Sequence, residues 1–232
     1  MATKFQPKAG TSGYRGDTGK EIGAWVAERI TRAYIALLMQ GREIQKRLTL
    51  VVAHDQRAGA DALAHVIAGV AAACGVDVLF VGQVTTGMLT VFMQGTRTNG
   101  ALYVTGSHMP AHRIGIIPLL PNAHYAGADV TDYIDNRFKI PNGNDFIAED
   151  MAEAMDMGEI KNMSLAAGNR ALMGAYTKVA SETINVLVPE TSESQKKTTH
   201  MHILVDIGNG TAGNAAACVL DESQLKEIFT EP

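Results

Sequence analysis

The residues best suited to chemistry lie in one short segment, Val104-Thr105-Gly106-Ser107-His108-Met109-Pro110. An apolar run, Gly100–Tyr103, precedes this segment and a proline closes it, so we predict a strand that runs into a sharp loop. A serine at such a strand tip is exposed, and its hydroxyl becomes a useful nucleophile when a base and electrostatic contacts assist it. An ordinary polar turn explains the segment alone more simply, so the rest of the chain must decide.

A second segment rich in small and polar residues opens the chain, from Ala9 to Gly16. It contains the hydroxyls of Thr11 and Ser12, the flexible backbone of Gly13 and the guanidinium of Arg15. This composition favours a concave loop of N–H donors around an anion. A flexible N-terminal turn would have the same composition, and the sequence alone does not separate the two interpretations.

A third segment, His54-Asp55-Gln56-Arg57, follows the continuous apolar run Leu48–Ala53. Such a run is typical of a strand that is buried on both faces of a sheet. In open α/β sheets ligands bind beyond the carboxyl ends of the strands, so Asp55 and Arg57 are candidate site residues. An ordinary ion pair within a loop accounts for them equally well.

Helical and strand patterns alternate between these segments. The spacing of apolar residues predicts helices over 21–40, 61–74, 85–94 and 129–138, and strands over 48–53, 76–81, 100–105 and 113–120. This alternation predicts an α/β fold whose parallel sheet lies between helices. Beyond residue 141 we expect a helical connector over 145–163, a helix over 165–187 and a strand over 201–207.

The composition excludes several classes of protein. Hydrophobic residues make up 46% of the 232-residue chain, which predicts a globular protein with a sizeable core. The net charge of −4 argues against a general nucleic-acid binder. No apolar run is long enough for a membrane span, and no signal peptide is recognisable at the N-terminus. Cys74 and Cys218 lie in alanine-rich surroundings, so we expect free thiols in a reducing cytoplasm.

The segment Gly208–Gly213 fits the dinucleotide-binding pattern G-x-G-x-x-G after a predicted strand. That pattern also needs an acidic residue about 20 positions further on, at the end of a second strand. The residues after Gly213 are instead typical of a helix and a tail, so a tight strand-to-helix turn explains the glycines better.

Together these segments resemble the α-D-phosphohexomutase family, the phosphomannomutases and phosphoglucomutases. Gly10–Gly16 matches the family's G-T-S-G-x-R-G loop, and Asp55 and Arg57 match two positions of its G-R-D-T-R loop. The family's active-site loop is T-A-S-H-N-P, and its second domain carries D-x-G-N-G-x-x-G. The residues that match those two patterns are Thr105, Ser107, His108 and Pro110, and then Asp206, Gly208, Asn209, Gly210 and Gly213.

The resemblance implies a mixed, mostly parallel sheet sandwiched by helices over 1–160, followed by an incomplete second α/β domain of the same type over 161–232. It implies that Ser107 carries a phosphoryl group between hexose 1-phosphate and hexose 6-phosphate, with hexose 1,6-bisphosphate as intermediate and activator. Mg²⁺ would bind through the phosphate on Ser107. His108 and Arg15 would join Ser107 as catalytic residues. The substrate and phosphate loops would contain Thr11, Ser12, Gly13, Asp55, Arg57 and Thr105.

The sequence departs from the family pattern in three places. The family has a lysine in the N-G-x-K segment after its serine loop, and Ile117 stands at that position here. The metal loop D-G-D-x-D-R does not occur in the sequence, and neither do the later sugar- and phosphate-binding loops. The chain ends in Glu231-Pro232, which resembles the start of the family's E-P-D-G-x-F-P segment. We therefore expect an N-terminal half that needs C-terminal domains or a complementary subunit to complete a catalytic cycle.

Two alternatives remain open. A non-catalytic relative that binds a phosphorylated sugar or a partner protein is favoured by Ile117 in place of lysine. A nicotinamide-dependent oxidoreductase would rest on Gly208–Gly213 alone. A serine hydrolase has less support, because neither serine segment contains G-x-S-x-G.

Overall fold

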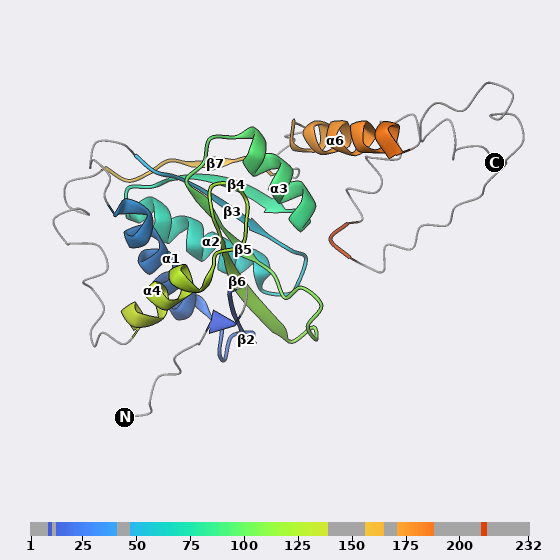
Figure 1. Ribbon diagram of the computed structural model, residues 1–232. Helices are drawn as coiled ribbons and strands as arrows, with labels where there is room; N and C mark the ends of the chain where they lie inside the picture. Colours follow the sequence, from blue (N-terminus) through green and yellow to red (C-terminus); the bar gives the residue numbers. More distant parts are fainter. Residues whose placement is uncertain are drawn as a thin grey trace, which may run out of the picture.

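A seven-stranded sheet forms the centre of the molecule (Figure 1). The computed structural model describes residues 9–10, 13–40, 47–138, 156–164, 171–187 and 210–212. The strands, in sheet order, are β1 (Ala9–Gly10), β2 (Gly13–Asp17), β6 (Arg113–Leu119), β5 (Gly100–Val104), β3 (Thr49–His54), β4 (Asp77–Gln83) and β7 (Ile160–Asn162). The helices are α1 (Ala24–Met39), α2 (Ala60–Ala73), α3 (Thr86–Gly95), α4 (Ala128–Phe138) and α6 (Ala171–Leu187).

The sheet is mixed, and its pairings divide evenly between the two directions. β3 pairs in parallel with β4 and β5, and β4 pairs in parallel with β7. The pairs β1–β2, β2–β6 and β5–β6 are antiparallel. The prediction of a mostly parallel sheet is therefore wrong in that detail. The connection from β5 to β6 is a short loop, whereas a parallel pair needs a crossover of a dozen or more residues.

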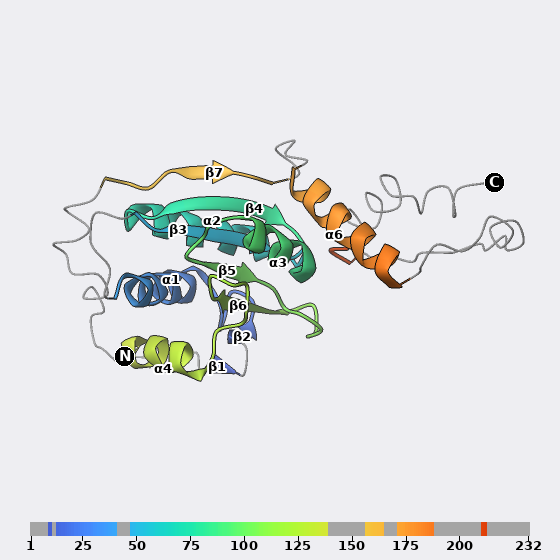
Figure 2. The same ribbon diagram turned by 45° about the horizontal axis from the view of Figure 1, so that its top comes forward.

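Both faces of the sheet are buried under helices. On β3 and β5, Val52 and Leu102 belong to the apolar cluster that also contains residues of α1, α2 and α4. Their neighbours Val51 and Ala101 belong to a second cluster, which contains residues of α3 and Leu172 of α6. Successive side chains of a strand point to opposite faces, so the continuous apolar run predicted for this strand is explained by the two helical layers. Figure 2 shows α1 and α4 on one side of the sheet.

The N-terminal glycine segment is a strand where described, whereas the sequence suggested a concave anion-binding loop or a flexible turn. β2 pairs with β6 in the register Tyr14 to Ile116. The buried Tyr14 hydroxyl lies 2.8 Å from the Asp135 carboxylate and 3.1 Å from the Thr131 carbonyl, so it ties β2 to α4. Glycine has low strand propensity, and it is the pairing partner β6 that makes this segment extended.

The segment before α6 also differs from the prediction. A helical connector was expected over 145–163, but residues Ile160–Asn162 form β7, which extends the sheet beyond β4. The prediction is wrong for these residues because a short exposed edge strand has no alternating apolar pattern. Residues 139–155 lie outside the described part of the chain.

The helix α6 packs against α3. The ring of Tyr176 lies against Gly87 near the start of α3, at 3.5 Å from the position of a Cβ there. The strand expected over 201–207 lies outside the described residues, and so do Cys218 and the helix expected after Gly213. The second domain and the boundary at residue 160 thus stay predictions. Within the described residues, no helix combines the length and the apolar character needed to cross a membrane.

Candidate active site

The serine loop, residues 105–112, joins β5 to β6 beyond the carboxyl ends of β3 and β5. The last pair in the parallel ladder between those strands is His54 with Val104. Directly after this pair, the amide of Asp55 donates to the Val104 carbonyl at 2.9 Å. The fold therefore brings the Asp55 segment and the serine loop together at the edge of the sheet where α/β proteins bind ligands.

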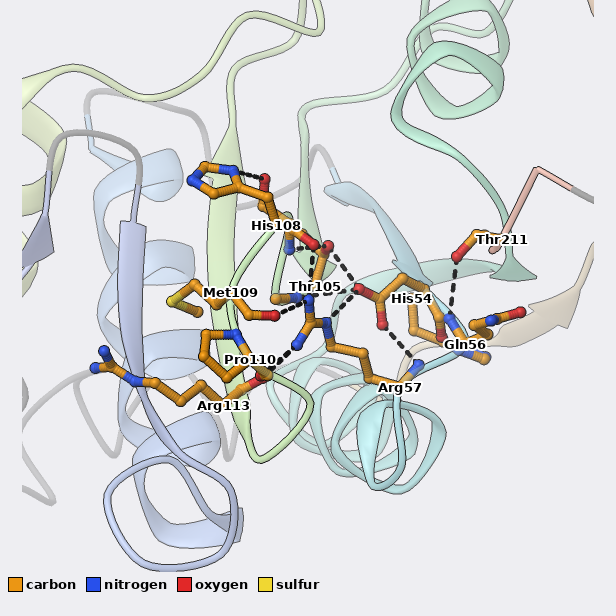
Figure 3. A network of polar contacts seen from close by, with 12 residues as sticks. His54, Gln56, Arg57, Thr105, His108, Met109, Pro110, Arg113 and Thr211 are labelled. Carbon is orange, nitrogen blue, oxygen red and sulfur yellow. Dashed lines mark hydrogen bonds and ion pairs between the residues drawn. The ribbon is translucent and has the colours of Figure 1, made fainter. Parts of the chain in front are cut away.

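The carboxylate of Asp55 connects Thr105 and Arg57, which lie close together in Figure 3. Asp55 is only 7% exposed. Its Oδ2 accepts from the Thr105 hydroxyl at 2.7 Å and from the Gly106 amide at 3.0 Å. Its Oδ1 accepts from the Arg57 amide at 2.9 Å. Hydrogen bonds to a charged acceptor are stronger than neutral ones, and here they fix the two segments to each other.

The hydroxyl of Thr105 passes this order on to Ser107. Thr105 is 6% exposed, and while its Oγ1 donates to Asp55 it also accepts from the Ser107 amide at 2.9 Å. The Thr105 amide donates to the Gly115 carbonyl at 3.0 Å, which continues the pairing with β6. Thr105 was predicted as a site residue, and its contacts in the structure orient the serine loop.

Ser107 is the exposed residue at the tip of this arrangement. Its φ of 51° lies in the left-handed region. This conformation costs a non-glycine residue about 1–3 kcal/mol, and it persists only where the surrounding structure enforces it. Its hydroxyl lies 3.2 Å from Nδ1 of the neighbouring His108, which is also exposed. A nucleophile and a base within hydrogen-bonding distance are the pair that serine chemistry requires.

The guanidinium of Arg57 donates hydrogen bonds to backbone carbonyls of the serine loop and of Arg113. Nη1 donates to the carbonyls of Pro110 and Arg113 at 2.7 and 3.1 Å. Nη2 donates to the carbonyls of Ser107 and Met109 at 2.7 and 2.6 Å. Nε lies 3.5 Å from the Asp55 carboxylate. The family resemblance placed Arg57 among the residues of the substrate and phosphate loops. Its contacts in the structure place it against the serine loop.

The stem of the Arg15 side chain lies beside the start of the serine loop. It stands opposite Gly115 in the β2–β6 ladder. A Cβ on Gly115 would lie 2.8 Å from Cγ of Arg15 and 3.0 Å from the Thr105 carbonyl. The Arg15 side chain therefore passes over Gly115, and its Nη1 lies 3.9 Å from the position of a Cβ on Gly10, beside the N-terminal glycine segment. Thr11 and Ser12 lie outside the described residues.

Gly13 allows β2 to approach β6 closely. Its φ is 114°, and a Cβ there would lie 2.6 Å from the Ile116 carbonyl oxygen and 2.9 Å from Cα of Ile117.

Ile117, which stands where the resembling family has lysine, is 2% exposed and packs in the same apolar cluster as Tyr103. The Tyr103 hydroxyl donates to the Val84 carbonyl at 2.8 Å. Burial, and then the charge of Asp55, raise the pKa of Tyr103 above its ordinary value.

Two features of this site were not anticipated from the sequence. The first is the contact of Gln56 with Thr211, and the second is the pair of contacts made by His54. The Gln56 amide donates to the hydroxyl of Thr211 at 3.3 Å, so Thr211 lies beside the Asp55 segment. The buried His54 ring has Nδ1 2.7 Å from the Asp55 carbonyl and Nε2 3.2 Å from the Asp61 carboxylate. The glycines around Thr211 were the only signal in the sequence for the first contact, and nothing pointed to the second.

The described residues do not make a metal site. Within them, no three His, Cys, Asp or Glu side chains are grouped so that they could hold a metal ion. The acidic side chain of Asp55 has both oxygens engaged by Thr105, Gly106 and Arg57. The implied Mg²⁺ therefore does not fit the donors that this part of the chain supplies.

Comparison with known proteins identifies the family. Residues 6–142 match the model of phosphoglucomutase/phosphomannomutase, alpha/beta/alpha domain I. A phosphoglucosamine mutase from Leuconostoc citreum is 30% identical over 107 residues, or 46% of this chain and 24% of that protein. A phosphomannomutase from Sinorhizobium fredii is 31% identical over 124 residues, or 53% of this chain and 26% of that protein.

The fold agrees with solved structures. A phosphoglucomutase/phosphomannomutase family protein from Burkholderia thailandensis superposes with a TM-score of 0.63 at 24% identity, covering 94% of this chain and 42% of that one. This chain therefore spans only part of its relatives, 24% and 26% of the two mutases named above. Because the family match runs from residue 6 to residue 142, more than half of the 232 residues, this chain belongs to the phosphoglucomutase/phosphomannomutase family and contains its domain I.

Proposed function

We propose that this chain is the N-terminal part of a phosphohexomutase, in which Ser107 carries the phosphoryl group that moves between the 1- and 6-positions of a hexose. One observation supports this most: an exposed serine, held in the left-handed conformation, has its hydroxyl 3.2 Å from a histidine nitrogen. The reaction would take place in the cytoplasm, where the buried free thiol of Cys74 stays reduced.

The proposed step is a phosphoryl exchange between Ser107 and hexose 1,6-bisphosphate. Oγ of Ser107 attacks one phosphorus atom, and the new O–P bond forms as the P–O bond to the sugar breaks. Nδ1 of His108 takes the serine proton and passes it to the sugar oxygen that leaves, which becomes a hydroxyl. In turnover, phosphorylated Ser107 gives its group to the free hydroxyl of a hexose monophosphate, the resulting bisphosphate turns, and Ser107 takes back the phosphate from the other end. Such transfers depend chiefly on positioning and on neutralising phosphate charge.

The chain offers part of the charge neutralisation. Arg15, on β2 opposite Gly115, is the proposed partner of the phosphate, together with the hydroxyls of Thr11 and Ser12 and the backbone amides of Thr11, Ser12 and Gly13. Asp55 and Thr105 hold the loop, and they do not contact the substrate in this scheme. Mg²⁺ would need ligands in addition to a phosphate on Ser107, so no step here is assigned to it. We propose that C-terminal domains or a complementary subunit supply those ligands and the sugar-binding groups.

Intact mass spectrometry tests the proposal. The purified protein is incubated with glucose 1,6-bisphosphate or mannose 1,6-bisphosphate, and its mass is measured before and after phosphatase treatment. We expect one phosphate, mapped to Ser107 by peptide analysis, and none in the Ser107→Ala variant. In His108→Ala, the rate of uptake should fall about 100-fold or more, the usual contribution of a general base. Uptake at another residue, or none in the wild-type protein with either sugar, would refute the role of Ser107.

One observation favours a second candidate, a non-catalytic relative that binds a phosphorylated sugar or a partner protein. Ile117 is buried at the position of the family lysine, so no cationic side chain from this position can meet the substrate. Binding of a hexose phosphate without phosphoryl uptake, in the same experiment, would support this second function.

A further inference from the structure

We propose that Arg57 is a positioning residue, which fixes the backbone of the serine loop, and that Gly106 lacks a side chain because Arg57 occupies that space. The meaning of this role for catalysis rests on the proposed function of Ser107. The role in shaping the loop does not, because it follows from contacts within the chain. The resemblance at the sequence level placed Arg57 among residues for substrate and phosphate, which is a different role.

Four of the five N–H groups of Arg57 are hydrogen-bonded to the serine loop and the residue after it. A guanidinium has five N–H groups in a planar fork. Four of them point to the carbonyls of Ser107, Met109, Pro110 and Arg113, at 2.6 to 3.1 Å. The fifth, on Nε, faces Asp55 at 3.5 Å, and the side chain is 15% exposed. A phosphate bound by Arg57 would have to displace one of these contacts and leave a carbonyl of the loop unpaired.

Gly106 lies directly against this side chain. A Cβ at Gly106 would overlap with Nε and Cζ of Arg57 and would lie 2.6 Å from its Cδ. The amide of Gly106 is held by Asp55, so the backbone cannot simply move away. The resembling family pattern has alanine at this position. In this chain, the arginine therefore runs closer to the loop than a side chain at position 106 would permit.

These contacts fix Ser107 from both sides. Its amide donates to Thr105, and its carbonyl accepts from Nη2 of Arg57. A residue with φ of 51° keeps that conformation only when its neighbours enforce it. The direction of the Ser107 hydroxyl thus depends on Arg57. Lysine cannot replace the fork, because an ammonium group is a point charge with no planar set of donors.

The test compares Arg57→Lys, Arg57→Gln and Gly106→Ala with two matched controls. Arg113→Gln removes a neighbouring arginine side chain, which faces Asp17 at 3.8 Å, and keeps the backbone carbonyl that Arg57 binds. Gly69→Ala adds a methyl group in α2 where nothing lies within 4 Å. Circular dichroism confirms that each variant is folded. Amide hydrogen exchange is measured without any ligand, and phosphoryl uptake from glucose 1,6-bisphosphate is measured over a range of concentrations.

A positioning role predicts that exchange at Gly106, Ser107 and Met109 speeds up about tenfold or more in all three test variants, and in neither control. It also predicts that the maximal rate of uptake falls about 100-fold, with the half-saturating concentration little changed. Free guanidinium ion should restore part of the rate in Arg57→Gln.

Unchanged exchange at these amides, with a raised half-saturating concentration, would overturn the proposal and make Arg57 a phosphate ligand. If the wild-type protein takes up no phosphate, the proposed function fails, and the exchange measurement still decides whether Arg57 shapes the loop. If Arg57→Gln fails to fold, Arg57→Lys and Gly106→Ala give the same two measurements.

Discussion

The hydroxyl of Thr105 forms hydrogen bonds with both the buried Asp55 carboxylate and the backbone of the exposed Ser107. It donates to the first and accepts from the amide of the second, at 2.7 and 2.9 Å. The presence of a threonine at the end of a buried strand would ordinarily be explained by the high strand propensity of this residue type. Here its oxygen connects the buried carboxylate of Asp55 to the backbone of Ser107.

Replacing Thr105 by valine keeps the shape of the side chain and removes this oxygen. We expect Thr105→Val to lower the free energy of unfolding by about 1–3 kcal/mol, since a buried acceptor and donor lose their partner. Urea denaturation of the variant measures this change. Thr105→Ser retains the oxygen and serves as the control. Equal stability of the valine and serine variants would show that the hydroxyl does not connect the two groups.

At the scale of elements, the close approach of β2 to β6 rests on Gly13. Alanine at this position would meet the Ile116 carbonyl at 2.6 Å in a backbone with φ of 114°. We expect Gly13→Ala to destabilise the fold by about 1–3 kcal/mol through backbone strain, and by more through the collision. Gly19 has φ of 76° with nothing within 4 Å of its Cβ position, so Gly19→Ala reports strain alone.

Chemical denaturation of both variants separates the two effects. A larger loss for Gly13→Ala than for Gly19→Ala is the expected result. Equal losses would mean that β6 yields to the added methyl group, and that the contact between the strands is looser than the structure indicates.

The sequence predicted the central elements well, because their apolar patterns are set by burial. The run Leu48–Ala53 predicted β3, and the spacing of apolar residues predicted α1, as the structure confirms within a few residues. β7 was missed, because an exposed edge strand is stabilised by pairing with β4 and leaves no apolar pattern. β2 was missed for a similar reason: its glycines become extended only when β6 is present.

The structure brings together five of the residues that the sequence singled out, while their hydrogen bonds were not foreseen, and the roles of these residues stay predictions. Ser107, His108, Thr105, Asp55 and Arg57 all meet at one edge of the sheet. That Arg57 binds loop carbonyls could not be predicted, because the direction of a long side chain depends on the loop that folds around it. Strand order was also hidden, since the reversal between β5 and β6 depends on the short serine loop.

At the scale of the whole molecule, buried tyrosine hydroxyls connect the layers. Tyr34 in α1 donates to the Leu119 carbonyl at 2.6 Å, and Tyr14 and Tyr103 make similar contacts from the sheet. Burial is the largest cause that raises the pKa of each, and Asp135 adds to it for Tyr14. Ionising any of them would place an anion where no water can solvate it.

The molecule should therefore lose stability in alkali. A group whose pKa is raised by folding stabilises the native state fully below its unfolded pKa, which for tyrosine is about 10. This stability is lost progressively as the pH rises above that value. Thermal melts from pH 7 to 11.5 measure the change. Tyr34→Phe should flatten the alkaline part of the profile, and an unchanged slope would show that Tyr34 does not contribute to it.

The pairing of β2 with β6 also has a consequence for biosynthesis. The ribosome delivers β2 well before its partner strand, which comes only with residues 113–119, and the α4 contacts of Tyr14 come later still. The parallel strands β3, β4 and β5 can assemble in the nascent chain before that point, since domains fold as they emerge. The arginine proposed to meet the phosphate is thus translated early and put in place late, so in a nascent chain that stalls before β6 the centre of the sheet can form while β2 still lacks its partner strand.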